Sequence, residues 1–227
     1  MDRDESLISI SGIVACHSCP RKYYFQQTLP GGVESERYTI AKQISAHLGS
    51  ELFVPRIWSE AQSVAPYLGD EAMDMLADWV RACQKEEWEA PSETDVRISS
   101  KRYGISGMVD MLYPDDSFAI VRSTEAPEAG IYTSDRIRVA CSLACIRESV
   151  NKNVEAGYVI YIPSGVIRRC SPEPRDRRAA LRAIRLARSV NTDGEPPKIP
   201  RGASCETCYL KEEHCQPEPR RLSDIFR

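Results

Sequence analysis

The sequence lacks any long apolar run. None of its segments, in 227 residues, approaches the roughly 20 consecutive apolar residues that cross a bilayer. The opening MDRDESLISISG has neither the basic region nor the apolar stretch of a secretion signal. No internal repeat is present either. We therefore expect a soluble, cytoplasmic protein that has no membrane partner and is not a repeat array.

A strong charge of one sign is also missing. The chain has 30 Lys and Arg against 33 Asp and Glu, which gives a formal net charge of −3. Domains that bind nucleic acid through their overall charge are strongly basic. Any anionic partner must therefore be bound by a local basic patch.

Cysteine, in contrast, is plentiful. The nine cysteines cannot all pair within one chain, because their number is odd. Cysteine clusters in a protein without an export signal indicate metal more often than disulfides. Two segments hold such clusters, SCETCYLKEEHC with Cys205, Cys208 and Cys215, and VACHSCPRKYYF with Cys16 and Cys19. The other four are typical of small buried side chains: Cys83, Cys141, Cys145 and Cys170.

The spacing of the clustered cysteines leaves two kinds of metal site open. The three tail cysteines need one more ligand for a tetrahedral site, and Cys19 or Cys16 would supply it. Thiolates suit both iron–sulfur clusters and zinc. The two Cys-x2-Cys pairs would also make two zinc knuckles, which would leave Cys215 over. His17 and His214 are further candidate ligands.

The periodicity of apolar residues predicts an α/β fold, with a mixed sheet and helices on its faces. We expect helices over 39–53, 70–88, 135–149 and 173–190, and strands over 93–102, 105–113, 118–122 and 157–162, the last followed by a short strand. The run NTDGEPPKIPRG at 191–202 predicts a linker. The predicted units are an N-terminal segment (1–38), a core (39–192), and a linker with the cysteine tail (193–227).

The two terminal cysteine segments carry a resemblance to a known family. A Cys-Pro followed by basic and aromatic residues, together with a C-terminal Cys-x2-Cys-x6-Cys, resembles the CRISPR-associated iron–sulfur exonucleases (the Cas-four family), which are related to RecB-type nucleases. The resemblance spans about residues 6–216. It implies a restriction-endonuclease-like PD-(D/E)xK core and a small iron–sulfur subdomain built from both termini. It also implies a [4Fe–4S] cluster bound by Cys19, Cys205, Cys208 and Cys215, and leaves the role of Cys16 open.

The resemblance also implies a nuclease site that binds Mg²⁺ or Mn²⁺. His47 stands where the family has a histidine, and Asp110 in GMVD matches the family aspartate. The acid-x-Lys pair on the next strand reads Ile120-x-Arg122 here. Positions two apart lie on one face of a strand, and an isoleucine cannot bind a metal ion. The sequence therefore predicts a former or altered catalytic site, in which Arg122 replaces the lysine.

Two further features bear on this site. Glu93 or Asp95 on the neighbouring strand would be a substitute carboxylate for the missing acid. On the following helix, Arg138 replaces the family glutamine and Ser142 the family tyrosine, four residues apart and on one face.

Arginines predict contact with DNA. Arg122, Arg136 and Arg138 would gather around the altered site and bind phosphate directly. The late helix EPRDRRAALRAIRLARS carries an arginine stripe that includes Arg178 and Arg182, for which a solvated helix face is the alternative. The aromatic residues that follow Cys19 would either stack on single-stranded DNA or cover the cluster.

Three functions follow from these features. The first is a DNA exonuclease of CRISPR spacer acquisition, which would trim single-stranded or prespacer ends together with the spacer integrase in antiviral defence. The second is a catalytically inactive accessory protein that binds DNA or a CRISPR-associated partner. The third is a zinc-stapled scaffold unrelated to nucleases. The replaced acid-x-Lys motif leaves enzymatic activity open.

Overall fold

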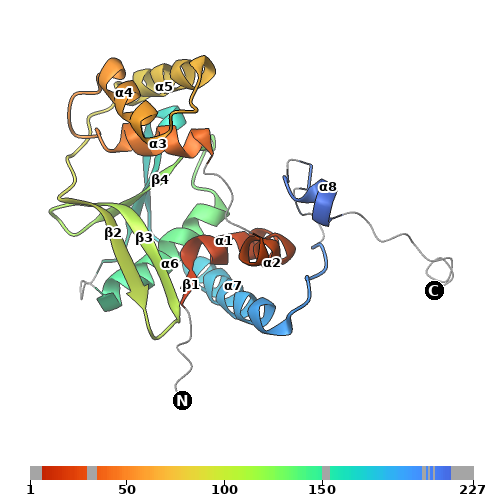
Figure 1. Ribbon diagram of the computed structural model, residues 1–227. Coiled ribbons are helices and arrows are strands. Elements are labelled where there is room, and N and C mark those ends of the chain that lie inside the picture. The colour runs from red at the N-terminus through yellow and green to blue at the C-terminus, as the bar shows by residue number, and fades with distance from the viewer. Residues whose placement is uncertain are drawn as a thin grey trace.

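The strands of the protein form one mixed sheet (Figure 1). The computed structural model describes residues 7–29, 35–149, 154–200, 203, 205–206 and 208–215. Six strands lie in these residues. They are β1 (Ile8–Ser9), β2 (Glu93–Ser100), β3 (Ile105–Leu112), β4 (Phe118–Arg122), β5 (Gly157–Tyr161) and β6 (Val166–Cys170).

Strand β3 has three neighbours. β2 pairs with it antiparallel along its whole length. On the other edge, β1 pairs in parallel with its first residues, and β4 pairs antiparallel with its last two, Met111 and Leu112. β4 then pairs in parallel with β5, and β5 pairs antiparallel with β6. Because β3 and β4 pair over so short a stretch, the backbone beside Asp110 is left without a ladder partner on the β4 side.

Helices cover both faces of the sheet (Figure 1). The helices are α1 (Ile10–Ser18), α2 (Pro20–Thr28), α3 (Glu36–Ser45), α4 (Val54–Val64), α5 (Asp70–Cys83), α6 (Thr133–Ser149), α7 (Pro174–Asp193), α8 (Lys211–His214) and the short 3₁₀ turn η1 (Ile162–Ser164). One core cluster joins the sheet to α1, α6 and α7, and a second joins it to α3, α4 and α5. The sheet is thus buried from both sides, as a mixed α/β sheet requires.

Close packing in the first core depends on one glycine. A Cβ atom on Gly107 of β3 would lie 2.7 Å from the side chain of Ile10 at the start of α1. The missing side chain lets α1 sit directly on β3. This contact brings the N-terminal helices to the centre of the fold.

The predicted α/β mixed sheet with helices on its faces is confirmed. Strand 118–122 has the predicted bounds, and the strands at 93–102, 105–113 and 157–162 are shorter by one or two residues. The helix predicted over 39–53 is instead α3, which ends at Ser45, and Gly49 in the following turn has a φ of +85°. The sequence analysis did not predict α1, α2 or α4. No helix in the described parts of the chain is both long and apolar enough to span a bilayer.

Candidate functional site

Asp110 lies at the point where β3 and β4 separate. Its Oδ2 accepts a hydrogen bond of 2.7 Å from the backbone N–H of Val121 on β4. Its Oδ1 lies 2.7 Å from the Nζ of Lys42 on α3. A side chain thus replaces the missing backbone pairing between the two strands, and the same carboxylate binds a cation from the helix above.

A second carboxylate reaches the same lysine. Thr94 pairs with Met111 and Val96 with Val109, so Asp95 on β2 faces Asp110 across the ladder. Its Oδ1 lies 2.5 Å from Lys42 Nζ. Asp95 has a φ of +53°, in the left-handed region that aspartate tolerates better than most residues. Such strained backbone is concentrated at functional sites. We call Lys42, Asp95 and Asp110 the Asp110 site.

Lys42 is held in its charged form. Its side chain is 21% exposed and that of Asp110 is 13% exposed. Burial acts to lower the pKa of Lys42, but the charge and hydrogen bonds of Asp110 and Asp95 outweigh it, and the net pKa is raised above its ordinary value of 10.5. An ammonium group therefore lies between two carboxylates at every physiological pH.

Arg122 and Asp135 form a separate ion pair on the α6 side of β4. Arg122 Nε lies 2.8 Å from Asp135 Oδ1, and the Asp135 side chain is only 1% exposed. Tyr161 of β5 donates a hydrogen bond of 2.9 Å to Asp135 Oδ2. Ile120, two residues before Arg122, is buried in the first core. The charge of Arg122 is therefore compensated within the protein.

Ser142 on α6 is buried, and Arg138 on the same helix is half-buried. Arg138 Nε and Ser142 Oγ have no hydrogen-bond partner among the described residues. Burial and the charge of Arg122 lower the pKa of Arg138, whereas the charges of Asp135 and Asp110 act to raise it. Arg138 thus lies close to both ion pairs, as the sequence predicted for the family glutamine position.

His47 has a different partner from the predicted one. Its Nε2 lies 2.6 Å from Glu60 Oε2 on α4, and Arg56 on the same helix is 3.0 Å from Glu60 Oε1. The hydrogen bond from His47, followed by that from Arg56, lowers the pKa of Glu60. The structure therefore brings Lys42, and not His47, to Asp110. His47 joins the end of α3 to α4.

The sequence analysis missed Lys42 and the pairing of Asp135 with Arg122 and Tyr161. A signal for Lys42 was present. The lysine expected at position 122 is absent, and between residues 39 and 149 the chain has only three lysines, at 42, 85 and 101. Asp95, weighed as an alternative to Glu93, is the substitute carboxylate that reaches the site.

A divalent metal ion does not fit this arrangement. An ammonium group already lies between Asp95 and Asp110, and the position of the former acid is a buried isoleucine. No three His, Cys, Asp or Glu side chains in the described segments are arranged to hold a single ion. Hard cations need several oxygen ligands around one point. Chemically, the Asp110 site is one ammonium group shared by two carboxylates.

The four cysteines implied by the resemblance line one cavity. Its volume is about 590 Å³, and Cys19, Cys205, Cys208 and Cys215 all border it. The first residues of α6, at Thr133 and Ser134, complete one wall. Residues at opposite ends of the chain therefore meet here. We call this the cysteine cavity.

Helix α2 binds the cysteine tail directly. Arg21 donates hydrogen bonds of 3.0 and 2.7 Å to the carbonyl oxygen of His214 and one of 3.2 Å to that of Pro197. The ring of Phe25 stacks on that of His214 with 4.4 Å between centroids. Lys22 lies over the ring of Tyr209 at 5.5 Å. Figure 1 shows α8 beside α2. These contacts position the tail cysteines next to Cys19.

Two helix N-termini border the cysteine cavity. Cys19 is the N-cap of α2, with Pro20 at the first helical position, and its Sγ accepts a hydrogen bond of 3.4 Å from Lys22 N. The first turn of α6 also lines the cavity. The positive ends of helix dipoles favour thiolate and other negative charge. The donor chemistry and the local field fit a thiolate-bound cluster, but among the described residues no three of these sulfur atoms are gathered around one point.

Cys16 does not belong to this cavity. It is fully buried in the first core, and burial, with a smaller contribution from Cys19, raises its pKa to about 11. A high pKa disfavours the thiolate that a metal needs. Cys16 is also absent from the residues that line the cavity, so its placement does not favour the zinc knuckle that would combine it with Cys19. The four remaining cysteines are buried, as predicted: Cys83, Cys141, Cys145 and Cys170.

The predicted DNA-binding arginines divide into two groups. Arg136 binds Asp176 at 3.0 Å, and Asp176 completes the capping box of α7, so this arginine joins two helices. Arg178 and Arg182 are exposed on α7. Their neighbours Ala179, Ala180 and Ala183 face the core. The exposed stripe of α7 is thus the accessible part of the predicted set.

The sequence matches no family model and no curated protein. Among solved structures, that of the Sulfolobus protein SSO0001 is similar over 93% of this chain and 87% of its own. The two chains are 14% identical and the TM-score is 0.43. A likeness at this level assigns neither a fold family nor a function.

Proposed function

We propose that this protein is a catalytically silent iron–sulfur protein that binds DNA and acts as an accessory factor. In this proposal the sheet is a restriction-endonuclease-like core of the RecB type, and both termini form an iron–sulfur subdomain around the cysteine cavity. The proposal favours the inactive alternative over a prespacer-trimming exonuclease.

The observation that carries this choice is the position of Lys42. Metal-dependent hydrolysis of a phosphodiester uses carboxylates to hold a cation, which activates water and offsets developing charge. Here Asp110 and Asp95 both bind Lys42 Nζ, within 2.7 Å. An ammonium group supplies positive charge but cannot bind and activate a water molecule as a metal ion does. The site therefore keeps its charge balance without keeping the means of cleavage.

The cysteine cavity supports the iron–sulfur part of the proposal. Four cysteines border a space of about 590 Å³. A mononuclear zinc site instead needs four donors within about 2.3 Å of one point. In the proposal Cys19, Cys205, Cys208 and Cys215 hold a [4Fe–4S] cluster. When bound, such a cluster supplies a covalent link between segments almost two hundred residues apart.

The exposed face of α7 supports DNA binding. Arg178 and Arg182 lie one turn apart and are exposed, and neither has an acidic partner among the described residues. Arginines arranged in this way contact phosphate without reading sequence. Because net charge is −3, binding must come from this patch and should weaken strongly with salt. The place in CRISPR spacer acquisition, beside the spacer integrase, rests on the resemblance of the terminal cysteines alone.

Anisotropy titration of a labelled single-stranded oligonucleotide, in EDTA and at several salt concentrations, tests the proposal. We expect binding without metal and no cleavage of the same oligonucleotide under single-turnover conditions with Mn²⁺. The double variant Arg178→Gln/Arg182→Gln should bind several-fold more weakly. It should also reduce the dependence of log affinity on log salt by about 0.7 for each phosphate that the variant no longer neutralises.

The matched control is Arg56→Gln/Arg81→Gln, which removes the same charge from α4 and α5 on the other face of the sheet. It should leave binding nearly unchanged. Equal weakening by the two double variants would show that α7 is not the DNA surface. Mn²⁺-dependent cleavage that is abolished in Asp110→Ala would instead establish the exonuclease and overturn the proposal.

A further inference from the structure

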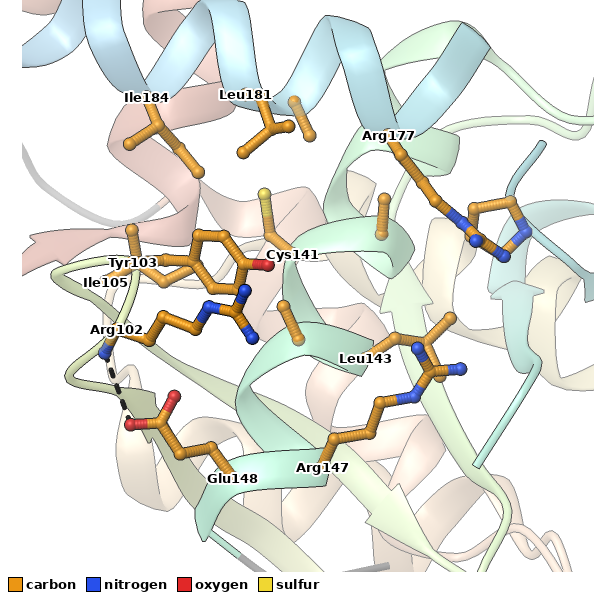
Figure 2. Close-up of a pocket in the computed structure, with 14 residues that line it drawn as sticks. Arg102, Tyr103, Ile105, Cys141, Leu143, Arg147, Glu148, Arg177, Leu181 and Ile184 are labelled. Atoms are coloured by element: carbon orange, nitrogen blue, oxygen red, sulfur yellow. Dashed lines mark hydrogen bonds between the residues drawn. The ribbon is translucent and has the colours of Figure 1, made fainter. Parts of the chain in front are cut away.

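A groove lies between α6, α7 and the β2–β3 turn, away from both sites described above. Its volume is about 550 Å³. Apolar side chains from both helices and from β3 form its floor, namely Ile105, Ala140, Leu143, Ala144, Ala180, Leu181 and Ile184. Figure 2 shows Cys141 among them, with its sulfur directed towards α7. We call this the α6–α7 groove.

The rim of the groove is positively charged. Arg102, Arg147 and Arg177 border it from three elements (Figure 2), and Glu148 is the one acidic residue in its lining. Glu148 is already engaged, because Ser100 Oγ donates to its Oε2 at 2.5 Å and Lys101 N donates to its Oε1 at 2.8 Å. The rim therefore carries three arginines against the one carboxylate of Glu148, and Arg147 also donates a hydrogen bond of 3.0 Å from its Nε to the carbonyl oxygen of Val154.

The wall formed by the β2–β3 turn is held in place. Arg188 of α7 donates a hydrogen bond of 2.7 Å to the carbonyl oxygen of Tyr103. Gly104, next to it, has a φ of +58°, and a Cβ there would lie 2.7 Å from Arg188 Nη2. The guanidinium of Arg102 lies over the Tyr103 ring at 5.4 Å. The groove is thus a preformed feature, as small-molecule sites usually are.

The lining selects the chemical class of the ligand. Sites of about 300–1,000 Å³ with an apolar floor and a few converging polar groups are typical of small molecules. The hydrocarbon floor would leave the polar edge of a nucleobase without hydrogen-bond partners, which is costly. An aliphatic body suits the floor, and a carboxylate suits the arginine rim because the two pair in bidentate fashion.

We propose that the α6–α7 groove binds a small amphiphilic carboxylate, with its hydrocarbon part on the floor and its acid group on Arg147 and Arg177. This binding site is independent of the cysteine cavity and of the proposed DNA contact. The groove lies on helices α6 and α7, so a bound ligand would link them at a second place besides the Arg136–Asp176 ion pair.

Displacement of a fluorescent dansyl-labelled undecanoate from the intact protein tests the proposal. We expect decanoate to displace the probe and decanol, which has a similar hydrocarbon part but no charge, to be at least about tenfold weaker. Arg147→Gln/Arg177→Gln should weaken decanoate binding by about tenfold or more. Ala144→Phe, which places a ring in the groove, should abolish it.

The control Arg185→Gln removes an exposed arginine of α7 that does not line the groove and should change nothing. Circular dichroism establishes that each variant is folded. If Ala144→Phe does not fold, the decanoate affinity of Arg147→Gln/Arg177→Gln still tests the proposal. Absence of binding overturns the proposal, as does equal displacement by decanol or an unchanged affinity in Arg147→Gln/Arg177→Gln. Displacement by an acidic Glu-Leu peptide but not by decanoate would overturn it in favour of a protein partner.

Discussion

The Asp110 site and the cysteine cavity differ in how their polar side chains are partnered. In the Asp110 site every charge has a partner on a neighbouring element, and Lys42 links α3 to β2 and β3. In the cysteine cavity four thiols border a space of about 590 Å³. The contacts that hold the chain around this cavity are made by other residues of α2 and the tail. The charged groups of the first region are partnered by protein side chains, whereas the thiols of the second border an open space that, in the proposed function, holds a cluster.

This difference shows how paired carboxylates can be kept inside a fold without a metal ion. A pair of carboxylates left without a cation would repel each other and lose favourable hydration, at a cost of several kcal/mol per buried ion. Lys42 removes that cost and needs no metal. No side-chain cation takes such a place among the residues that line the cysteine cavity, and in the proposed function a cluster would join them.

The largest expected effect is the loss of the chromophore in Cys208→Ser. Anaerobically purified wild-type protein should be brown with the broad visible absorption of an iron–sulfur cluster, and the variant should be colourless. Because the cluster joins the two ends of the chain, limited proteolysis should cut the variant faster at its termini. Cys16→Ala is the matched control and should stay brown. A colourless, zinc-loaded wild-type protein would contradict the iron–sulfur assignment.

The second effect is expected at Lys42. Asp110 is mostly buried but Asp95 is 52% exposed, so removing their shared cation should reduce the free energy of unfolding of Lys42→Met by roughly 1–2 kcal/mol in urea titrations. The freed carboxylates of Asp95 and Asp110 should then bind Mn²⁺, measured by calorimetry, whereas the wild type should not. Lys101→Met, on the β2–β3 turn, is the control and should show neither change. Equal Mn²⁺ affinity in wild type and Lys42→Met would show that the lysine does not take the place of a cation.

The smallest effect is the pH dependence that this lysine creates. The pKa of Lys42 is raised in the folded protein, so the folded state holds the proton more tightly than the unfolded state. The stabilisation is complete below the ordinary pKa of 10.5 and is lost as pH rises through the raised value. The stability difference between wild type and Lys42→Met should therefore be constant from about pH 7 to about pH 10 and shrink above that. A difference that shrinks towards acidic pH, within the range where the carboxylates stay ionised, would contradict this assignment.

The sequence predicted the sheet better than the site. The strands could be predicted from the alternation of apolar residues and from clear turn sequences, because both signals are local. The link between Lys42 and Asp110 joins residues 68 positions apart, and neither the helix nor the strand pattern signals it. The same holds for His47, whose partner Glu60 belongs to a helix that was not predicted.

At the cysteine tail the candidate site residues were predicted from the sequence, whereas the neighbouring helix was not. Thiol chemistry left Cys16 or Cys19 as the partner of the tail cysteines, and the family resemblance implied Cys19. Cys19 and the three tail cysteines border one cavity. Helix α2 was not predicted, because it has few buried side chains and is held instead by Arg21 and Phe25 against the tail. Long-range contacts of this kind leave no periodic signal.

The hydrogen bond from Val121 N to Asp110 Oδ2 has a consequence for which residues of the sheet can be replaced. It makes Asp110 a structural part of the sheet, because the side chain takes the place of a backbone hydrogen bond between β3 and β4. Ile120 is packed in the first core, and its side chain supplies no polar contact between the strands. Asp110 cannot be replaced freely, because its loss would open the sheet where its two halves join.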